Sequence, residues 1–197
     1  MKTRISPDSF ATHRFIWWTN ALECPPMSAA KLTPGPLSPE ELNVFIEIAQ
    51  GSSVKYELDK ESGLLKVDRF IHSAMVYPFN YGFVPGTMTD DGDPLDVAVL
   101  SAQPVIPGSI LPARPIGLLD MEDESGMDIK IIAVPTKAVD PWYAEIEDIE
   151  NLDKHTLSEI KHFFSHYKEL ESGKWVKIRH FGGREEALEA IRKSILS

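Results

Sequence analysis

The chain has 197 residues, of which 43% are hydrophobic and 25% are charged, and its formal net charge at pH 7 is -10. These values predict a soluble globular protein with a single sizeable core. The excess of negative charge disfavours binding to nucleic acid or to an anionic membrane surface, unless the charge is inverted locally. No stretch of the sequence is apolar over enough residues to predict a membrane span.

The single cysteine, Cys24, excludes a disulfide within the chain and fits a reducing compartment. The apolar run at residues 15–18 is too short for the hydrophobic part of a secretory signal. Together these features predict a cytoplasmic protein.

Residues 1–36 contain five prolines and show no hydrophobic period, so they predict an irregular N-terminal extension. Met27 would make a natural start by itself, and we therefore expect the first 26 residues to be dispensable. The four residues 38–41 (SPEE) have the form of a capping box with proline at the first helical position, which predicts a short helix. We expect residues 37–197 to form one domain.

The centre of the chain is rich in short runs that alternate between apolar and polar residues or are apolar throughout. Turn residues such as proline and glycine separate these runs, as is typical of strands. Several short strands within about 100 residues predict a closed antiparallel or mixed barrel. The runs that we assign to strands are residues 43–50, 53–60, 64–72, 94–100, 113–121 and 128–135.

The last third of the chain has a helical period. Residues 156–159 (TLSE) form a capping box, apolar residues then recur at helical spacing, and Gly173 can end this helix. A second helix is expected from about residue 185 to residue 196. The predicted fold class is therefore α+β, with a mostly β core and flanking C-terminal helices.

Four of the seven residues from Asp90 to Asp96 are aspartates, directly before an apolar strand. A solvated turn is one interpretation, because Asp, Gly and Pro are turn residues. An EF-hand calcium loop from Asp91 fails, since Asp96 stands where Gly is needed and Ala102 where Glu is needed. A glycosidase carboxylate pair gives no reason for four acids.

A metal site explains more of this pattern. Gly92 permits a sharp turn, and Pro94 restricts the backbone so that Asp91, Asp93 and Asp96 can converge. Clustered carboxylate oxygens select Mg²⁺ or Mn²⁺. A second acidic group is either a polar hairpin loop or a further part of such a site: Glu122, Asp123, Glu124 and Asp128.

Cations and phenols are placed near these acids. Asp128 and Lys130 share one face of a predicted strand, as do Lys55, Glu57 and Asp59 of another. Arg69 falls on the apolar face of its strand, where it needs either a structural salt bridge or an anion such as phosphate. Three tyrosines are either core residues or hydrogen-bond donors to an anion: Tyr77, Tyr81 and Tyr167.

The run from Asp91 to Val97, DGDPLDV, matches at every position the signature of the family I soluble inorganic pyrophosphatases. The chain resembles the short prokaryotic form of that family over roughly residues 38–180. Further matching segments include KYELDKESG (55–63), AMVYPFNYGFVPGT (74–87), RPIGLLDMEDESG (114–126) and HFFSHYKELESGKWVK (162–177).

The resemblance implies an OB-like closed β-barrel and Mg²⁺-dependent hydrolysis of pyrophosphate to two orthophosphates by a metal-activated water. Several ions are expected per site, and Mn²⁺ or Zn²⁺ is expected to substitute. By the same resemblance Asp93 is the catalytic base, and the metal ligands are Asp91, Asp96, Asp123 and Asp128. The phosphate contacts are Lys55, Arg69, Tyr81, Lys130, Tyr167 and Lys168, with Glu47, Glu57 and Tyr77 in the outer shell.

Assembly is also implied by the resemblance, as a homohexamer built from two trimers. His162, His166 and Glu169 form a polar stripe on the predicted helix that starts near residue 156; the stripe is either a solvated face or a subunit contact. Two other functions are alternatives. One is a metal-dependent hydrolase for a different phosphate compound. The other is an oligonucleotide-binding module, which the charge of -10 argues against.

Overall fold

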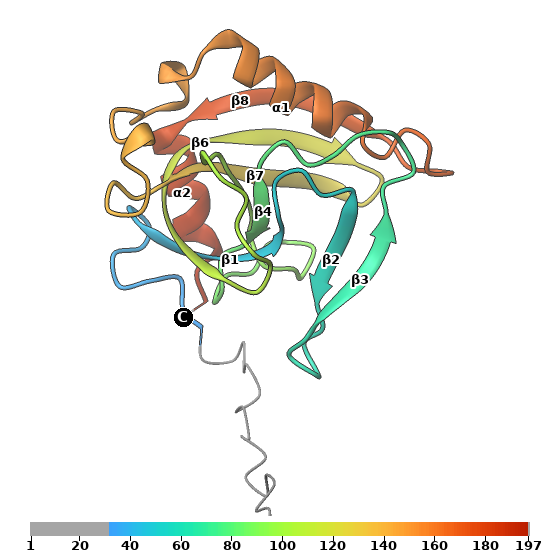
Figure 1. Cartoon of the computed structure of the whole chain (residues 1–197), viewed down its shortest axis with the longest axis horizontal. Coiled ribbons are helices and arrows are strands. Elements are labelled where there is room, and N and C mark those ends of the chain that lie inside the picture. The colour runs from blue at the N-terminus through green and yellow to red at the C-terminus, as the bar shows by residue number, and fades with distance from the viewer. Residues whose placement is uncertain (1–31, 197) are drawn as a thin grey trace, which may run out of the picture.

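The computed structural model describes residues 32–196 (Figure 1). This part of the chain is mostly β-sheet with two α-helices. The helices are α1 (Lys154–His166) and α2 (Arg184–Ser194), and short 3₁₀ turns lie at Pro141–Tyr143 and Ile149–Asn151. The strands are β1 (Leu42–Ile48), β2 (Val54–Leu58), β3 (Leu65–Phe70), β4 (Asn80–Phe83), β5 (Asp96–Val99), β6 (Ile110–Asp123), β7 (Gly126–Pro135) and β8 (Val176–Gly183).

Six strands form the main sheet in the order β1-β4-β5-β7-β6-β8, and β1 also pairs with β6, so that five strands are linked in a ring. The β5–β7 pairing is parallel and the others are antiparallel. The long strand β6 makes this arrangement possible because its first residues pair with β1 and its later residues pair with β8. Its register shifts between Pro115 and Gly117, where the pairing with β7 is interrupted.

The hairpin of β2 and β3 is a separate two-stranded sheet. In Figure 1 it stands to one side of the main sheet. Lys55 on β2 lies opposite Arg69 on β3, and the register shifts directly after this pair. The hairpin therefore presents two cations side by side.

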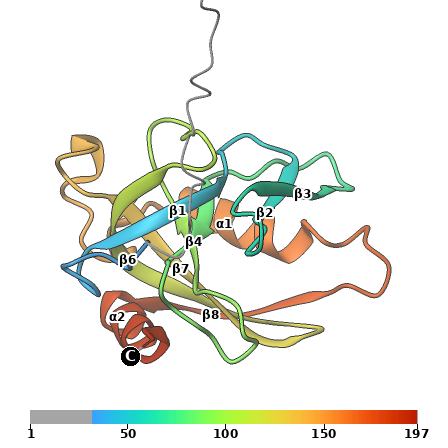
Figure 2. The same cartoon turned by 90° about the horizontal axis from the view of Figure 1, so that it is seen from below.

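The two helices cover different parts of the sheet (Figure 2). Phe163 and Phe164 of α1 are buried with Phe79, which directly precedes β4, and with apolar residues of the ring strands. Ala187 and Ile191 of α2 belong to a second buried cluster, which β1, β5 and β7 also supply. No helix within residues 32–196 is long and apolar enough to cross a membrane.

All six segments predicted as strands contain strands, but β4 and β8 were not predicted from the sequence. The helix predicted at residues 38–41 is wrong: these residues form turns, and β1 begins at Leu42. The apolar residues from Leu42 onward pair in the sheet directly after residue 41, so no helix longer than a single turn fits before β1.

The predicted cap of α1 is also wrong. The helix begins at Lys154 because the Asp153 side chain accepts hydrogen bonds from the backbone N–H groups of His155 and Thr156. The Thr156 hydroxyl, inside the helix, donates to Asp153. The helix ends at His166 rather than near Gly173, and residues 167–173 form turns. Most of the predicted extension, residues 1–31, lies outside the described residues.

Candidate active site

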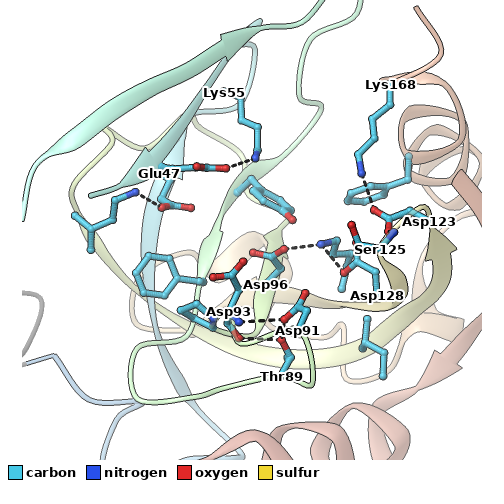
Figure 3. Close-up of a pocket in the computed structure, with 18 of the residues that line it drawn as sticks. Glu47, Lys55, Thr89, Asp91, Asp93, Asp96, Asp123, Ser125, Asp128 and Lys168 are labelled. Carbon is cyan, nitrogen blue, oxygen red and sulfur yellow. Dashed lines mark hydrogen bonds and ion pairs between the residues drawn. The ribbon is translucent and has the colours of Figure 1, made fainter. Parts of the chain in front are cut away.

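A cavity of about 760 Å³ lies where the β2–β3 hairpin, the loop before β5, the β6–β7 turn and the segment after α1 meet (Figure 3). Carboxylates and cations line it together with three tyrosines. All of the site residues predicted from the sequence are among the lining residues: Glu47, Lys55, Glu57, Arg69, Tyr77, Tyr81, Asp91, Asp93, Asp96, Asp123, Asp128, Lys130, Tyr167 and Lys168.

The loop before β5 brings three aspartates to one wall of the cavity. Gly92 has a positive φ of 86°, and Thr89 N–H donates to the Asp93 carbonyl, which closes a tight turn. The Asp91 carboxylate accepts a hydrogen bond from the Asp93 backbone at 3.0 Å. Asp96 follows as the first residue of β5. Asp91, Asp93 and Asp96 all line the same cavity.

Lys130 lies between two of the carboxylates. Its Nζ is 2.5 Å from Asp96 Oδ2 and 2.6 Å from Asp128 Oδ1, and only 7% of its side chain is exposed. Burial alone would lower the pKa of Lys130, but the charges of Asp96 and Asp128 outweigh burial and raise it. Burial raises the pKa of Asp128, and Lys130 offsets part of this rise. Lys130 is therefore a cation held between two acids.

The β6–β7 turn and the segment after α1 form a second wall. Lys168 Nζ is 2.7 Å from Asp123 Oδ2 and 3.8 Å from Glu124 Oε1. The Ser125 N–H also donates to Asp123. Burial would raise the pKa of Asp123, but these hydrogen bonds and the Lys168 charge hold it below its usual value. Asp123 is ionised and half of a buried ion pair.

The hairpin supplies the third wall. Lys55 pairs with Glu57 and, at 3.3 Å, with Asp68. Arg69 pairs with Asp68 on its own strand and with Glu171 at 2.9 Å. Burial alone would lower the pKa of Arg69, and the bonds to the two carboxylates raise it above its usual value. A structural salt bridge for Arg69 is present, and Arg69 also lines the cavity.

Glu47 on β1 differs from the other acids because its neighbours give it little positive charge. Its side chain accepts a hydrogen bond from the Leu58 backbone at 2.7 Å and is otherwise buried. Burial raises the pKa of Glu47 to about 8. Glu47 therefore joins β1 to the hairpin and can hold a proton near neutral pH.

The three tyrosines are buried beneath the cavity. Burial raises the pKa of Tyr77, Tyr81 and Tyr167, so each phenol stays protonated and can donate a hydrogen bond. Their rings pack against Phe163 and Phe164 of α1. The core interpretation and the donor interpretation are therefore compatible.

Sequence reasoning missed several side chains that face the cavity. Lys60 contacts Asp93 at 3.3 Å, and Lys174 contacts Glu124 at 2.5 Å. Lys66 lines the same cavity. Lys174 lies within a segment quoted for the family resemblance, which was a usable signal. Lys60 lies within another such segment, residues 55–63, whereas nothing in the local pattern distinguishes Lys66 from a solvated lysine.

No group of three or more His, Cys, Asp or Glu side chains in residues 32–196 is gathered closely enough to hold a metal ion as it stands. The acids instead alternate with lysines and arginine around the cavity. Such a cavity suits a small, highly charged ligand, because acids can bind cations and the basic groups can bind an anion. A mostly β fold with this polar cavity defines the class of protein as one that acts on a small charged molecule.

Comparison with known proteins identifies the family. The inorganic pyrophosphatase family model matches residues 44–197. An inorganic pyrophosphatase of Aquifex pyrophilus is 54% identical over 169 residues, which is 86% of this chain and 96% of the relative. The chain belongs to the inorganic pyrophosphatase family and, as a member, is a hydrolase.

Solved structures agree with this assignment. The inorganic pyrophosphatase of Thermus thermophilus has a TM-score of 0.82 and 43% identity, covering 85% of this chain and 97% of that one. The enzyme of Helicobacter pylori has a TM-score of 0.78 and 52% identity, covering 79% and 92%. The predictions of the family and of pyrophosphate hydrolysis are confirmed.

Proposed function

We propose that this cavity is the active site and that it hydrolyses pyrophosphate to two orthophosphates with the help of Mg²⁺. The observation that carries the proposal is the arrangement of acids and bases around one cavity. Pyrophosphate is a compact polyanion, which the aspartates alone would repel. The basic side chains and bound cations together can neutralise it.

The aspartates fit a magnesium site by their chemistry. Mg²⁺ prefers carboxylate oxygens and water, and it is usually held by a few carboxylates together with substrate phosphates. We assign Asp91, Asp96, Asp123 and Asp128 as the side chains that would hold several ions, with Mn²⁺ or Zn²⁺ as substitutes. When bound, the ions would neutralise phosphate charge and make a water molecule more acidic.

The basic and phenolic groups are assigned to the phosphates. Arg69 offers a planar fork for two phosphate oxygens, whereas lysines act as point charges. Charge that develops on the leaving phosphate is stabilised by groups already placed around it. The residues assigned to this role are Lys55, Arg69, Tyr81, Lys130, Tyr167 and Lys168. Glu47, Glu57 and Tyr77 are assigned to the outer shell of the site.

Asp93 is assigned as the general base. Its side chain is 73% exposed and its contact with Lys60 is at 3.3 Å, so its carboxylate faces the cavity without a buried partner. A carboxylate in this position can accept a proton from the attacking water.

Replacing Asp96 by Ala tests the magnesium assignment. We expect the Mg²⁺ concentration for half-maximal phosphate release to rise at least about tenfold, as is typical when a metal ligand's environment is lost. Asp90→Ala is the matched control, because Asp90 is an exposed acid of the same loop that does not line the cavity. An unchanged Mg²⁺ titration for Asp96→Ala would remove Asp96 from the ligand set.

The substrate is tested by comparing phosphate release from pyrophosphate, ATP and a phosphate monoester, each with and without Mg²⁺. We expect pyrophosphate to be hydrolysed far faster than the other two. Equal or faster release from ATP or the monoester would favour a hydrolase for a different phosphate compound.

The proposal also covers the barrel, the domain, the location and the assembly of the protein. We assign the ring of five strands to an OB-like barrel, and residues 37–197 to one domain. We propose a cytoplasmic homohexamer made of two trimers, with pyrophosphate rather than nucleic acid or membrane as its partner. His162 and His166 of α1, whose ring centroids are 4.4 Å apart, are assigned to the subunit contact. Glu169, the third residue of the predicted stripe, lies beyond the end of α1.

A further inference from the structure

The β2–β3 hairpin carries Lys55 and Arg69 but has few connections to the rest of the described chain. It pairs with no strand of the six-stranded sheet. At its base, Gly51 N–H donates to the Tyr77 carbonyl and Tyr77 N–H donates to the Ser52 carbonyl. Further along, the Leu58 N–H donates to Glu47, which holds the β2 side. β3 is held by its backbone pairing with β2, and side-chain contacts join it to the rest of the described chain.

Arg69 makes the main contact of this kind from β3. Its Nε donates to Glu171 Oε1 at 2.9 Å across 102 residues of sequence. The Glu171 side chain is only 10% exposed and that of Arg69 is 25% exposed, so solvent screens the pair little. Nη1 of Arg69 donates to the Asp68 carboxylate, and among the described residues Nη2 of Arg69 has no partner. Carboxylates thus hold two of the three guanidinium nitrogens, and Arg69 also lines the cavity.

Backbone hydrogen bonds hold Glu171 within the turn that follows α1. Its N–H donates to the Lys168 carbonyl at 2.8 Å, and its carbonyl accepts from Lys174 N–H at 3.1 Å. The Lys168 side chain in turn reaches Asp123, at the end of β6, at 2.7 Å. The turn that follows α1 therefore contacts both sides of the cavity: it gives a carboxylate to the hairpin and an ammonium to the β6–β7 turn.

We propose that Glu171 is a positioning residue that holds the Arg69 guanidinium, and with it the β3 side of the hairpin, in the orientation that binds the phosphates of the substrate. This inference rests on the proposed function, in which Arg69 contacts phosphate. A free arginine side chain has many rotamers, and phosphate binding alone would have to overcome the entropy lost in fixing one of them. Holding Nε before the substrate arrives reduces that cost and aims the remaining N–H groups at the cavity.

The first test is the effect of Glu171→Ala on the kinetics of pyrophosphate hydrolysis. We expect KM to rise roughly tenfold, as for loss of a hydrogen bond to a charged group, while kcat changes less than about threefold. Glu171→Gln keeps an acceptor without the charge and is expected to raise KM less. Glu145→Gln, which removes one charge at an exposed position remote from the cavity, is the matched control and should leave KM unchanged.

A double-mutant cycle shows whether Glu171 acts by positioning Arg69 or only by stabilising the fold. In the Arg69→Ala background, Glu171→Ala should change KM by less than about twofold, because the group that it positions is gone. If the two substitutions instead multiply their effects, Glu171 acts on something other than Arg69 and the inference is wrong. It is also wrong if Glu171→Ala lowers the melting temperature but leaves KM at the wild-type value.

Hydrogen exchange without substrate tests the same contact independently of activity. We expect the amides of β3 to exchange faster in Glu171→Ala than in the wild type and in Glu145→Gln. If the wild type failed to hydrolyse pyrophosphate with Mg²⁺, the proposed function would fall while this measurement still tested the contact. If the wild type is active and β3 exchanges at the same rate in all three proteins, the inference about Glu171 is overturned.

Discussion

At the scale of single residues, the aspartates of the loop before β5 have different surroundings, although they are alike in sequence. Asp96 and Asp128 are held by Lys130, whereas the largely exposed carboxylate of Asp93 contacts the exposed Lys60. A group that must accept a proton is better left without a firmly bound cation, since a cation favours the unprotonated form. This difference supports separate roles for these acids.

Asp93→Asn is therefore expected to lower kcat by about 10²-fold or more, while Mg²⁺ and substrate binding stay near their wild-type values. The amide keeps the size of the side chain but cannot accept the proton of the attacking water. Steady-state kinetics together with calorimetric Mg²⁺ binding check this, with Asp90→Asn as the control. If the variant keeps more than about a tenth of the wild-type kcat, Asp93 is not the base.

Glu47 gives a prediction about stability rather than turnover. Its pKa is about 8 in the folded protein, against an ordinary value of 4.5, because it is buried. The folded state therefore holds a proton that the unfolded state releases above pH 4.5. The resulting stabilisation is complete below that pH and is lost as the pH rises through 8.

Urea unfolding of metal-free protein at pH 5 and pH 9 measures this effect. We expect Glu47→Gln, which cannot ionise, to lack a decline on the order of 4 kcal/mol that the wild type shows between these pH values. Glu57→Gln, at a more exposed acid of the hairpin, should decline as the wild type does. If the free energy of unfolding declines equally in the wild type and in Glu47→Gln between pH 5 and pH 9, Glu47 is ionised at both pH values.

The site could be predicted from the sequence only as far as local patterns reach. The period of two in β7 placed Asp128 and Lys130 on one face, and the structure joins them at 2.6 Å. The pairing of Arg69 with Glu171 spans 102 residues and has no local signature. Contacts of this kind depend on how elements pack, which the sequence pattern does not specify.

At the scale of elements, strands with a clear apolar pattern were predicted, and those without one were missed. β4 has only four residues, Asn80–Phe83, all buried, so no alternation of exposed and buried positions reveals a period. β8 carries several exposed residues and lies outside the ring, where only β6 pairs with it. The start of α1 was misplaced because Asp153 and Thr156 are both good caps, and the structure uses the earlier one.

Gly82 of β4 shows how closely the strands of the ring approach one another. A Cβ atom there would lie 1.8 Å from the Phe45 carbonyl oxygen of β1, which is backbone and cannot move aside easily. We expect Gly82→Ala to lower the free energy of unfolding by about 3 kcal/mol, as overpacking of a core does. Urea unfolding checks this value.

Gly183→Ala is the control for Gly82→Ala. Its new Cβ would meet only the Asp148 side chain, at 3.3 Å, and its φ of -73° suits alanine. The expected cost is about 1 kcal/mol, since Gly183 caps α2 and alanine is a poorer cap. Equal stabilities of the two variants would show that β1 and β4 can separate at little cost.

At the scale of the whole molecule, every residue assigned to the site lies between Glu47 and Lys168. A chain that starts at Met27 is therefore expected to fold and to keep pyrophosphatase activity within about twofold of the full chain, because it retains the whole family match at residues 44–197. Specific activity and sedimentation of the two chains check this. Loss of solubility or activity would show that the first 26 residues contribute to the domain or to assembly.

The proposed hexamer leads to a prediction about pH. Histidine is the side chain that most readily changes charge between pH 5 and 8, and the His162 and His166 rings lie 4.4 Å apart on α1. Glu169 lies beyond the end of the helix, so it does not continue the helical stripe as predicted. If this surface joins trimers, protonation brings like charges together from several subunits, and that repulsion opposes assembly.

We therefore expect a hexamer at pH 7 to 8 that dissociates toward trimers near pH 5, with His166→Gln losing part of this dependence. Glutamine keeps the polarity of the position but stays neutral, so one source of repulsion per subunit is removed. Sedimentation of both proteins across the pH range measures the effect, and His155→Gln is a control at the other end of the same helix. A monomer at every pH, or a hexamer that responds to neither pH nor His166→Gln, would leave the histidines as an ordinary solvated face of α1.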